Sequence, residues 1–152
     1  MTLSVKLEHC ADLTIEVAQP LEIGPTALGI RRVIPILGGQ VTGPRLSGII
    51  REGGADFQVL RPDGVTELQA RYVIETAEGL VYIENNGLRH GTPEAMERLR
   101  RGEFVDPSQI YFRSTPRFET AVEGLRWLTT RLFVGAAARF PDRVELSVYL
   151  VA

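Results

Sequence analysis

Apolar and polar residues alternate with a period of two near both ends of the chain. Leu3, Val5 and Leu7 alternate with polar residues near the start, and the segment Val144–Leu150 repeats this pattern near the end. A period of two is typical of a strand that has one apolar face. We therefore predict a β-strand close to each end of the chain.

Further strands are predicted between these two. The runs with strand composition are Leu13–Val17, Ile30–Ile36, Gly48–Ile50, Asp56–Leu60, Glu67–Thr76, Leu80–Glu84, Ile110–Arg113 and Leu128–Ala137. Most of them are separated by residues that favour turns. These are Gly38-Gly39, Gly43-Pro44, Gly53-Gly54, Pro62-Asp63-Gly64, Glu78-Gly79 and Asn86-Gly87.

One segment has the signals of a helix. Thr92 is suited to cap it, Pro93 to occupy its first position, and Gly102 to end it. The sequence therefore predicts one short helix over residues 93–101 and gives no signal for a second.

Many short strands and one helix indicate an all-β fold, either an antiparallel barrel or a sandwich. The 15 glycines favour a single antiparallel β-barrel, because a strongly coiled sheet needs tight corners and bulges. No long linker, low-complexity tract or internal repeat divides the chain. We predict one β-barrel domain over residues 1–152.

Composition restricts the function. The net charge of −2 provides no basic surface, so nucleic acid is not an expected partner. No apolar run reaches the roughly 20 residues of a membrane span, and none at the start resembles a signal peptide. We expect a cytoplasmic protein that does not bind membranes. Cys10 is the only cysteine and the two histidines lie far apart, so we predict no metal site.

The segment Ile110–Thr120 places charged residues among aromatic ones. Tyr111 and Arg113 share one face, and Arg117 and Glu119 share a face after the break at Pro116. One interpretation gives Arg113, Arg117 and Glu119 fixed partners, which could be a ligand, another subunit or each other. The other makes the charges a solvated surface and the phenylalanines core. Trp127, a little downstream, fits the core or a cavity wall.

The run Glu67–Thr76 has two distinct faces. Tyr72 belongs to the apolar face, whereas Arg71 and Glu75 belong to the polar one. The polar face could line a cavity, or it could be a solvated surface with a weak ion pair. In the next run, Tyr82 offers a hydroxyl, and Asn85 could form hydrogen bonds at the mouth of a barrel.

Sequence motifs for flavin, nicotinamide or nucleotide binding are missing, and so is the nucleophile motif of the α/β-hydrolases. We therefore expect no cofactor. The chemistry that remains is proton transfer by carboxyl or hydroxyl groups in an apolar cavity, where a buried carboxyl acquires a raised pKa. Arginines would anchor an anionic group.

Four long motifs resemble one family. They are GIRRVIPILGGQVTGPRLSG, REGGADFQVLRPDGVTELQARYVIET, VDPSQIYFRSTPRFET and WLTTRLFVG. Their order and spacing are similar to those of the uncharacterised protein family 0311, also called domain of unknown function 3237. This resemblance implies a barrel of the calycin or allene-oxide-cyclase-like kind and an oligomer, so we expect a homo-oligomer. It implies no established activity.

Three positions depart from the pattern of that family. The family usually has Trp at Phe57, Asp at Gln69, and Asn-Arg at Thr129-Thr130. A carboxylate is therefore lost at Gln69, which would alter activity if the family used it as a base. Asp56 is retained and is the safer candidate.

We therefore predict a cofactor-independent isomerase, lyase or cyclase with a small-molecule substrate. Asp56 or Glu75 would move the proton, and a set of polar and aromatic residues would bind the substrate. This set is Arg71, Tyr72, Tyr82, Asn85, Tyr111, Arg113, Arg117 and Trp127. The alternative is a non-catalytic barrel that binds a small acidic or aromatic ligand, and a weaker one is a structural oligomer. Convergence of Asp56, Arg71, Glu75 and Arg113 on one pocket would support the first two.

Overall fold

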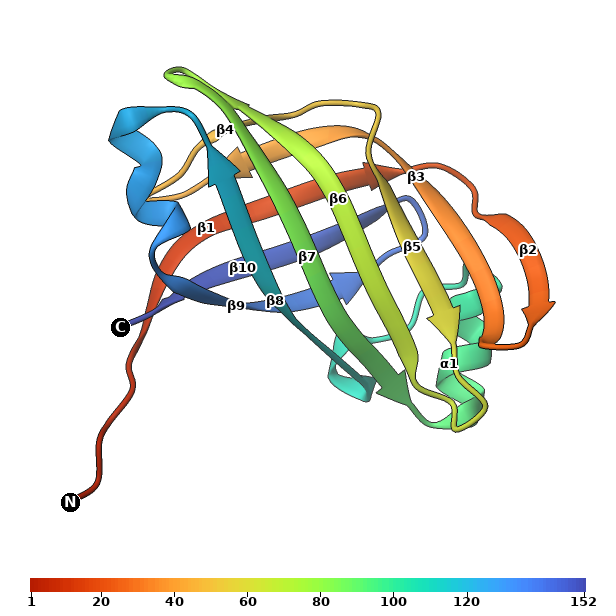
Figure 1. The fold of residues 1–152 in the computed structure, drawn as a ribbon. Helices are drawn as coiled ribbons and strands as arrows, with labels where there is room; N and C mark the ends of the chain where they lie inside the picture. Colours follow the sequence, from red (N-terminus) through yellow and green to blue (C-terminus); the bar gives the residue numbers. More distant parts are fainter.

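The computed structural model covers residues 1–152 and shows a closed antiparallel β-barrel of eight strand positions (Figure 1). The strands are β1 (Leu7–Val17), β2 (Leu21–Thr26), β3 (Gly29–Thr42), β4 (Gly48–Ile50), β5 (Ala55–Leu60), β6 (Thr66–Thr76), β7 (Gly79–Gly91), β8 (Ile110–Thr120), β9 (Leu132–Arg139) and β10 (Arg143–Val151). The helices are α1 (Pro93–Arg100) and the 3₁₀ turns η1 (Pro107–Gln109) and η2 (Glu123–Thr129).

Pairing of the first strand closes the barrel. β1 pairs with β10 on one side and with β3 on the other, and the circuit continues through β9, β8, β7 and β6. β4 and β5 share one position between β6 and β3, while β2 pairs only with β3. Because the sheet returns to its first strand, the predicted barrel is confirmed over the sandwich.

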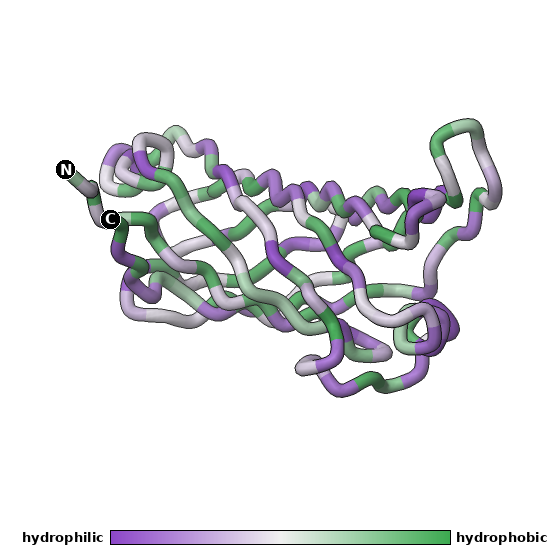
Figure 2. Tube along the Cα trace, turned by 90° about the horizontal axis from the view of Figure 1, so that it is seen from below, coloured by the Kyte–Doolittle hydropathy of each residue, from purple (hydrophilic) through white to green (hydrophobic).

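Alternation along the strands separates a buried face from an outer one. In β6, Tyr72 and Ile74 are buried, whereas Arg71 and Glu75 lie on the opposite face. Figure 2 shows the same change between hydrophobic and hydrophilic residues along the trace. The core fills the barrel interior, where Ile74, Val81 and Ile83 are completely buried.

The glycine pair in β3 forms a corner rather than the end of a strand. Gly38 and Gly39 have positive φ angles of 152° and 146°, and a Cβ on Gly39 would collide with the carbonyl oxygen of Thr14. Before this point β3 pairs with β5, and after it with β4. The pair therefore lets one long strand bend and change partners.

Two turn or break signals also lie inside strands. Asn86-Gly87, predicted as a turn, is part of β7 and pairs with Thr115 and Ser114 of β8. Pro116 was expected in a bent strand or an edge strand, and it lies within β8. The residue pairs between β8 and β9 are limited to Arg113↔Ala136 and Ser114↔Gly135, so β8 has a free edge where the proline removes a donor.

Other boundaries differ from the prediction in smaller ways. β1 begins at Leu7 rather than Leu3, and the preceding residues extend away from the barrel (Figure 1). β2 was not predicted because its sequence, LEIGPT, contains both Gly and Pro. Leu128 belongs to η2 rather than to a strand. The helix was predicted to within one residue.

The two ends of the barrel are closed differently. η2 buries Leu125 and Leu128 in the main core at one end. At the other end α1 packs on a separate small cluster of Ala95, Leu99 and Val105. Thr92 caps α1 by accepting a hydrogen bond from the Ala95 N–H at 3.2 Å. None of the helices has the length and apolar character needed to cross a bilayer.

Candidate active site

A cavity lies inside the barrel, with space for water centres of about 40 Å³. That space is enough for roughly three water molecules. Most of its lining is apolar. The polar lining residues are Asp56, Tyr72, Asn85, Ser114 and Arg139.

Strand register brings two of these polar residues to the same level. Asp56 of β5 lies opposite Ala70 of β6, and Ala70 lies opposite Asn85 of β7. Ala70 has only a methyl side chain, so space remains between the carboxyl and the amide. The cavity therefore results from a small residue placed between two polar ones.

Asp56 has one satisfied and one free carboxyl oxygen. Its Oδ2 accepts a hydrogen bond from Gln58 Nε2 at 2.7 Å, whereas Oδ1 is buried without a partner. Burial raises the pKa of Asp56, although the Gln58 hydrogen bond and the charges of Arg89 and Arg139 act in the opposite direction. A carboxyl with a raised pKa and a free oxygen is suited to exchange protons with a bound ligand.

The other polar groups of the cavity also lack partners. Tyr72 Oη, Asn85 Oδ1, Ser114 Oγ and Arg139 Nη1 are buried and form no hydrogen bond within the chain. Burial and the nearby Asp56 raise the pKa of Tyr72, so its hydroxyl stays protonated and can donate. Buried polar atoms in proteins are normally hydrogen-bonded. Several unpaired atoms around one cavity therefore indicate a site for a polar ligand or ordered water.

A larger cavity, here called the vestibule, lies under α1 and next to the first. Its volume is about 450 Å³. Arg32, Gln58, Thr66 and Arg89 of the barrel line one side, and Met96 and Arg100 of α1 line the other. Gln58 accepts a hydrogen bond from Arg89 Nη2 at 3.4 Å and also donates to Asp56. The Gln58–Arg89 pair therefore separates the vestibule from the lumen.

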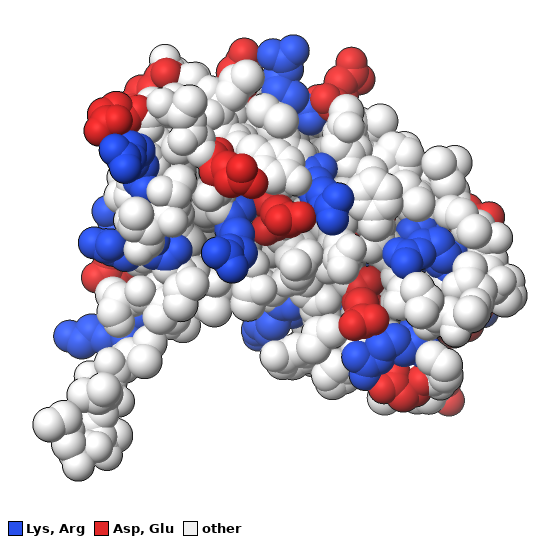
Figure 3. All heavy atoms as spheres, in the orientation of Figure 1, with Lys and Arg blue, Asp and Glu red and all other residues white.

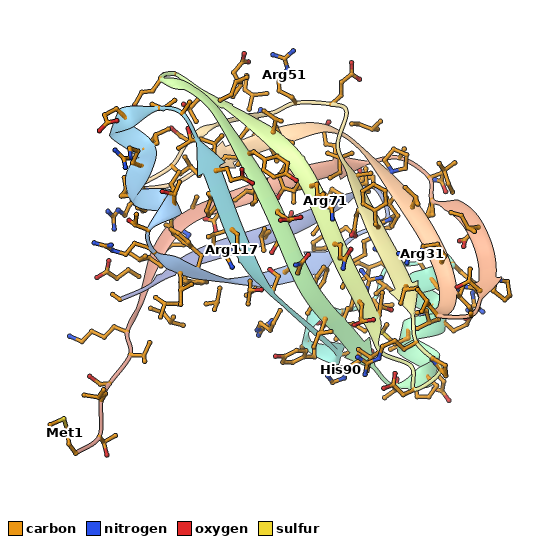
Figure 4. The ribbon with its side chains drawn as sticks, viewed as in Figure 1. Met1, Arg31, Arg51, Arg71, His90 and Arg117 are labelled. Carbon is orange, nitrogen blue, oxygen red and sulfur yellow. The ribbon has the colours of Figure 1, made fainter.

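Three of the predicted site residues line the lumen: Asp56, Tyr72 and Asn85. Arg71 and Glu75 do not, because both lie on the outer face of β6. Arg71 pairs with Glu84 at 3.0 Å and Glu75 with Arg51 at 3.1 Å. Figure 4 shows Arg71 on the outer wall. The interpretation of this face of β6 as a solvated surface is therefore correct. Arg71 and Glu75 pair with Glu84 and Arg51 rather than with each other.

The β8 candidates also lie outside the barrel. Phe112 and Phe118 are buried, so the odd-numbered residues Tyr111, Arg113 and Arg117 of the same strand face outward. Figure 4 shows Arg117 on the outer wall. Tyr111 and Arg113 line a groove on the outer surface. Asp56 therefore does not converge with Arg71, Glu75 and Arg113 on one pocket, so this grouping gives the enzyme and ligand-binding hypotheses no support.

Tyr82 and Trp127 are also remote from the cavity. Tyr82 lies on the outer face of β7, opposite Val73 and Glu119. Trp127 belongs to η2 at the far end, where it packs against the core and lies 4.3 Å from the guanidinium carbon of Arg45. Neither residue can contact a ligand held beside Asp56.

Sequence reasoning missed four polar residues of the interior. Gln58 lies two residues after Asp56, and Ser114 lies two residues after Phe112. Residues two apart on a strand share a face, so this alternation could have identified both Gln58 and Ser114. Arg89 and Arg139 lie near the ends of their strands. No motif marks either arginine. Arg89 is brought towards β5 by the pairing of β7 with β6 and of β6 with β5, whereas Arg139 comes near Asp56 across the barrel.

The side chains that could hold a metal ion are scattered. No three His, Cys, Asp or Glu side chains lie close enough together to form such a site. Charges of both signs are interspersed on the face in Figure 3.

Gln69, which replaces the usual Asp of the family, is exposed on the outer face of β6. This replacement therefore removes no carboxylate from the lumen.

Residues 5–151 match the profile of a family described as "Protein of unknown function (DUF3237)". The chain belongs to this family. A UPF0311 protein of Bradyrhizobium diazoefficiens is 45% identical over 152 residues, which cover 99% of both chains. A UPF0311 protein of Clostridium acetobutylicum is 42% identical over 147 residues, covering 95% of this chain and 93% of that one. The predicted family membership is confirmed.

Solved structures share the fold. A conserved protein of unknown function from Rhodopseudomonas palustris is 45% identical, with a TM-score of 0.93 over 100% of both chains. A protein from Acinetobacter baumannii described as beta-barrel like is 35% identical, with a TM-score of 0.87 over 100% of this chain and 99% of that one. An enzyme from Penicillium herquei is 16% identical, with a TM-score of 0.74 over 100% and 98% of the chains, which shows a shared fold.

Proposed function

We propose that this DUF3237 protein is an acid–base enzyme that needs no cofactor and acts on a small, largely apolar molecule in the barrel lumen. One observation carries the proposal. The free Oδ1 of Asp56 and the unpaired atoms of Tyr72, Asn85, Ser114 and Arg139 surround one apolar cavity. A barrel that only filled its core would not leave these atoms unsatisfied.

The residues divide into a base and groups that stabilise charge. Asp56 Oδ1 takes a proton from an acidic C–H or O–H of the substrate, and the electron pair left behind moves toward a substrate oxygen. The Tyr72 hydroxyl and the Arg139 guanidinium stabilise that developing negative charge. If Asp56 returns the proton to a different carbon, the reaction is an isomerisation. If the C–O bond to a leaving group breaks and the departing oxygen takes the proton, it is an elimination. If the deprotonated oxygen attacks an electron-poor carbon of a double bond and the proton goes to the other carbon of that bond, it is a ring closure, and none of the three changes the net oxidation state.

The protonation state of Asp56 determines the pH range in which the reaction proceeds. Its raised pKa keeps a protonated fraction available at a higher pH than an exposed aspartate would. The same carboxyl can therefore act as base in one step and acid in the next. Gln58 fixes its orientation through Oδ2 and leaves Oδ1 for the substrate.

Substrate entry requires movement at the α1 end. The cavity holds only a few water molecules, whereas typical small-molecule sites measure about 300–1,000 Å³. The vestibule supplies the missing volume once Arg89 or Gln58 moves aside. Since α1 packs on its own small cluster, it can shift without disrupting the main core.

The comparisons support the fold of this chain as one used by an enzyme. The Penicillium herquei protein is described as an enzyme, so this barrel architecture is compatible with catalysis. The bacterial relatives are of unknown function. The proposed chemistry therefore rests on the lumen of this chain.

The test compares wild type with Asp56→Asn on a small-molecule extract of Bradyrhizobium diazoefficiens, the source of a close relative. Glu75→Gln is the matched control, because Glu75 is a carboxylate on the outer face. Mass spectrometry should detect a compound consumed by wild type and by Glu75→Gln but not by Asp56→Asn. If no compound is consumed and one is retained equally by wild type and Asp56→Asn, the barrel is a binding protein and the proposal fails.

A further inference from the structure

Arg89 is a buried positive charge that lacks a full set of partners. Its exposure is 5%, and its Nε and Nη1 atoms are buried without hydrogen bonds. Nη2 alone bonds to Gln58, at a long 3.4 Å. The guanidinium carbon lies 5.2 Å from the centre of the Phe112 ring, which supports the group on one side and leaves its edge free.

The other charges around the vestibule already have partners. Arg32 donates to Glu22 at 2.9 Å, Arg100 lies 3.6 Å from Glu97, and Asp63 pairs with Arg61. Arg139 also lines the lumen, but it is only partly buried and has Asp142 nearby. Asp56 also lies near Arg89, but it is linked to Arg89 only through Gln58, so the Nε and Nη1 donors of Arg89 remain free for a ligand.

We propose that Arg89 binds a carboxylate group of the substrate at the boundary between the vestibule and the lumen. The inference rests on the proposed function and adds the substrate class, a small apolar molecule bearing one carboxylate. A planar guanidinium matches a carboxylate in shape and charge. One guanidinium with free N–H donors suits a single carboxylate, whereas Asp63 and Glu97 of the vestibule would repel a second negative charge.

The position of Arg89 also sets the spacing within the substrate. Gln58 alone lies between Arg89 and Asp56, through hydrogen bonds of 3.4 and 2.7 Å. A carboxylate at Arg89 therefore places the reacting atom only a few bonds away, beside Asp56 Oδ1. The apolar part of the molecule then lies along Leu68 and Phe112 of the lumen.

The test uses phenylacetate and its neutral analogue phenylacetamide as probes. Binding to wild type, Arg89→Met and Arg71→Met is measured by NMR titration, with Arg71 as a matched arginine on the outer face. Wild type and Arg71→Met should prefer phenylacetate by about tenfold or more, and Arg89→Met should lose that preference. Equal affinity of wild type for both probes, or an unchanged preference in Arg89→Met, would overturn the proposal.

A second readout covers the case in which Arg89→Met does not fold. The Nε–H signal of Arg89 in wild type, assigned by its absence in Arg89→Lys, should shift on addition of phenylacetate and not of phenylacetamide. An unmoved signal during phenylacetate binding overturns the proposal. Binding requires no turnover, so Asp56→Asn should retain the phenylacetate preference. The proposal that Arg89 binds a carboxylate and the proposal that Asp56 transfers a proton can therefore be refuted independently.

Discussion

Gln58 donates a 2.7 Å hydrogen bond to one carboxyl oxygen of Asp56, and the second oxygen faces the lumen without a partner. The two residues are two positions apart on β5, so the pleat directs both side chains inward. Gln58 is itself held by Arg89 on its other side. This arrangement fixes a buried carboxyl in one orientation while it keeps one oxygen available to a ligand.

Stability should fall with rising pH because of Asp56. Burial raises the pKa of Asp56 in the folded chain above the value of about 3.9 in the unfolded chain. The folded state therefore holds this proton more tightly. Its stabilising effect is complete below the unfolded pKa and is lost as the pH rises through the raised folded pKa.

Asp56→Asn removes this effect. The free energy of unfolding of the variant should equal or exceed that of wild type at pH 7.5, and the difference should shrink as the pH approaches 4. Urea unfolding at several pH values measures both curves. The difference between the wild-type and Asp56→Asn curves isolates the contribution of Asp56 to the unfolding free energy. Other titrating groups contribute equally to both curves, such as Asp12, whose pKa is lowered chiefly by its hydrogen bond to Ser147. A variant that is less stable at pH 7.5 would contradict the raised pKa.

Tyr72→Phe should reduce turnover without loss of stability. The Tyr72 hydroxyl is buried and unpaired in the free protein, a condition that costs about 1–3 kcal/mol. Its removal should leave Tm unchanged or raise it by about 2–4 °C, as expected for about 1 kcal/mol. The loss of a donor to developing charge should lower kcat by roughly 10²-fold. Tyr82→Phe, on the outer face, should change neither quantity, and a comparable loss of kcat there would refute the assignment.

Ala70→Val should fill the space between Asp56 and Asn85. The extra methyl groups enter an existing cavity, so the free energy of unfolding should change by less than about 1.5 kcal/mol. Substrate affinity should fall about tenfold or more, since even one methylene is worth 10–200-fold. Val73→Ile adds a methyl group on the outer face of the same strand and should leave affinity unchanged. Retained affinity in Ala70→Val would show that substrate binds elsewhere.

Arg71→Gln should have little effect. Arg71 and Glu84 form an ion pair of 3.0 Å with both side chains well exposed, and such pairs contribute about 0–1 kcal/mol. We expect turnover equal to wild type and a Tm within about 4 °C. A large loss of turnover would restore Arg71 to the site. Thermal unfolding and steady-state kinetics on one preparation provide both values.

The sequence predicts the barrel well because strand alternation and turn residues are local signals. The faces of β6 were separated correctly, with Tyr72 on one and Arg71 on the other. Which face lines the lumen depends on closure of the sheet, and the polar face was assigned to the site although it is the outer one. A functional site was expected among charged residues, whereas the lumen holds few of them.

Local signals also misled where glycine serves packing rather than turning. Asn86-Gly87 has turn chemistry, yet Gly87 lies within β7, where a Cβ would approach the carbonyl oxygen of Arg113 to 2.8 Å. Arg139 and Arg89 reach Asp56 from strands distant in sequence. Their roles depend on the tertiary arrangement, which no spacing in the chain records.

Deuterium incorporation from D₂O tests the central claim, proton transfer by Asp56, most directly. Wild type, Glu75→Gln and Asp56→Asn are incubated in D₂O with the same bacterial extract, and each compound is followed by mass spectrometry. Exchange of the abstracted proton between Asp56 and solvent before its return should add one deuterium to a particular compound with wild type and Glu75→Gln, and the Asp56→Asn reaction should match the protein-free control. Equal labelling by Asp56→Asn, or no labelling by wild type, would contradict the role assigned to Asp56.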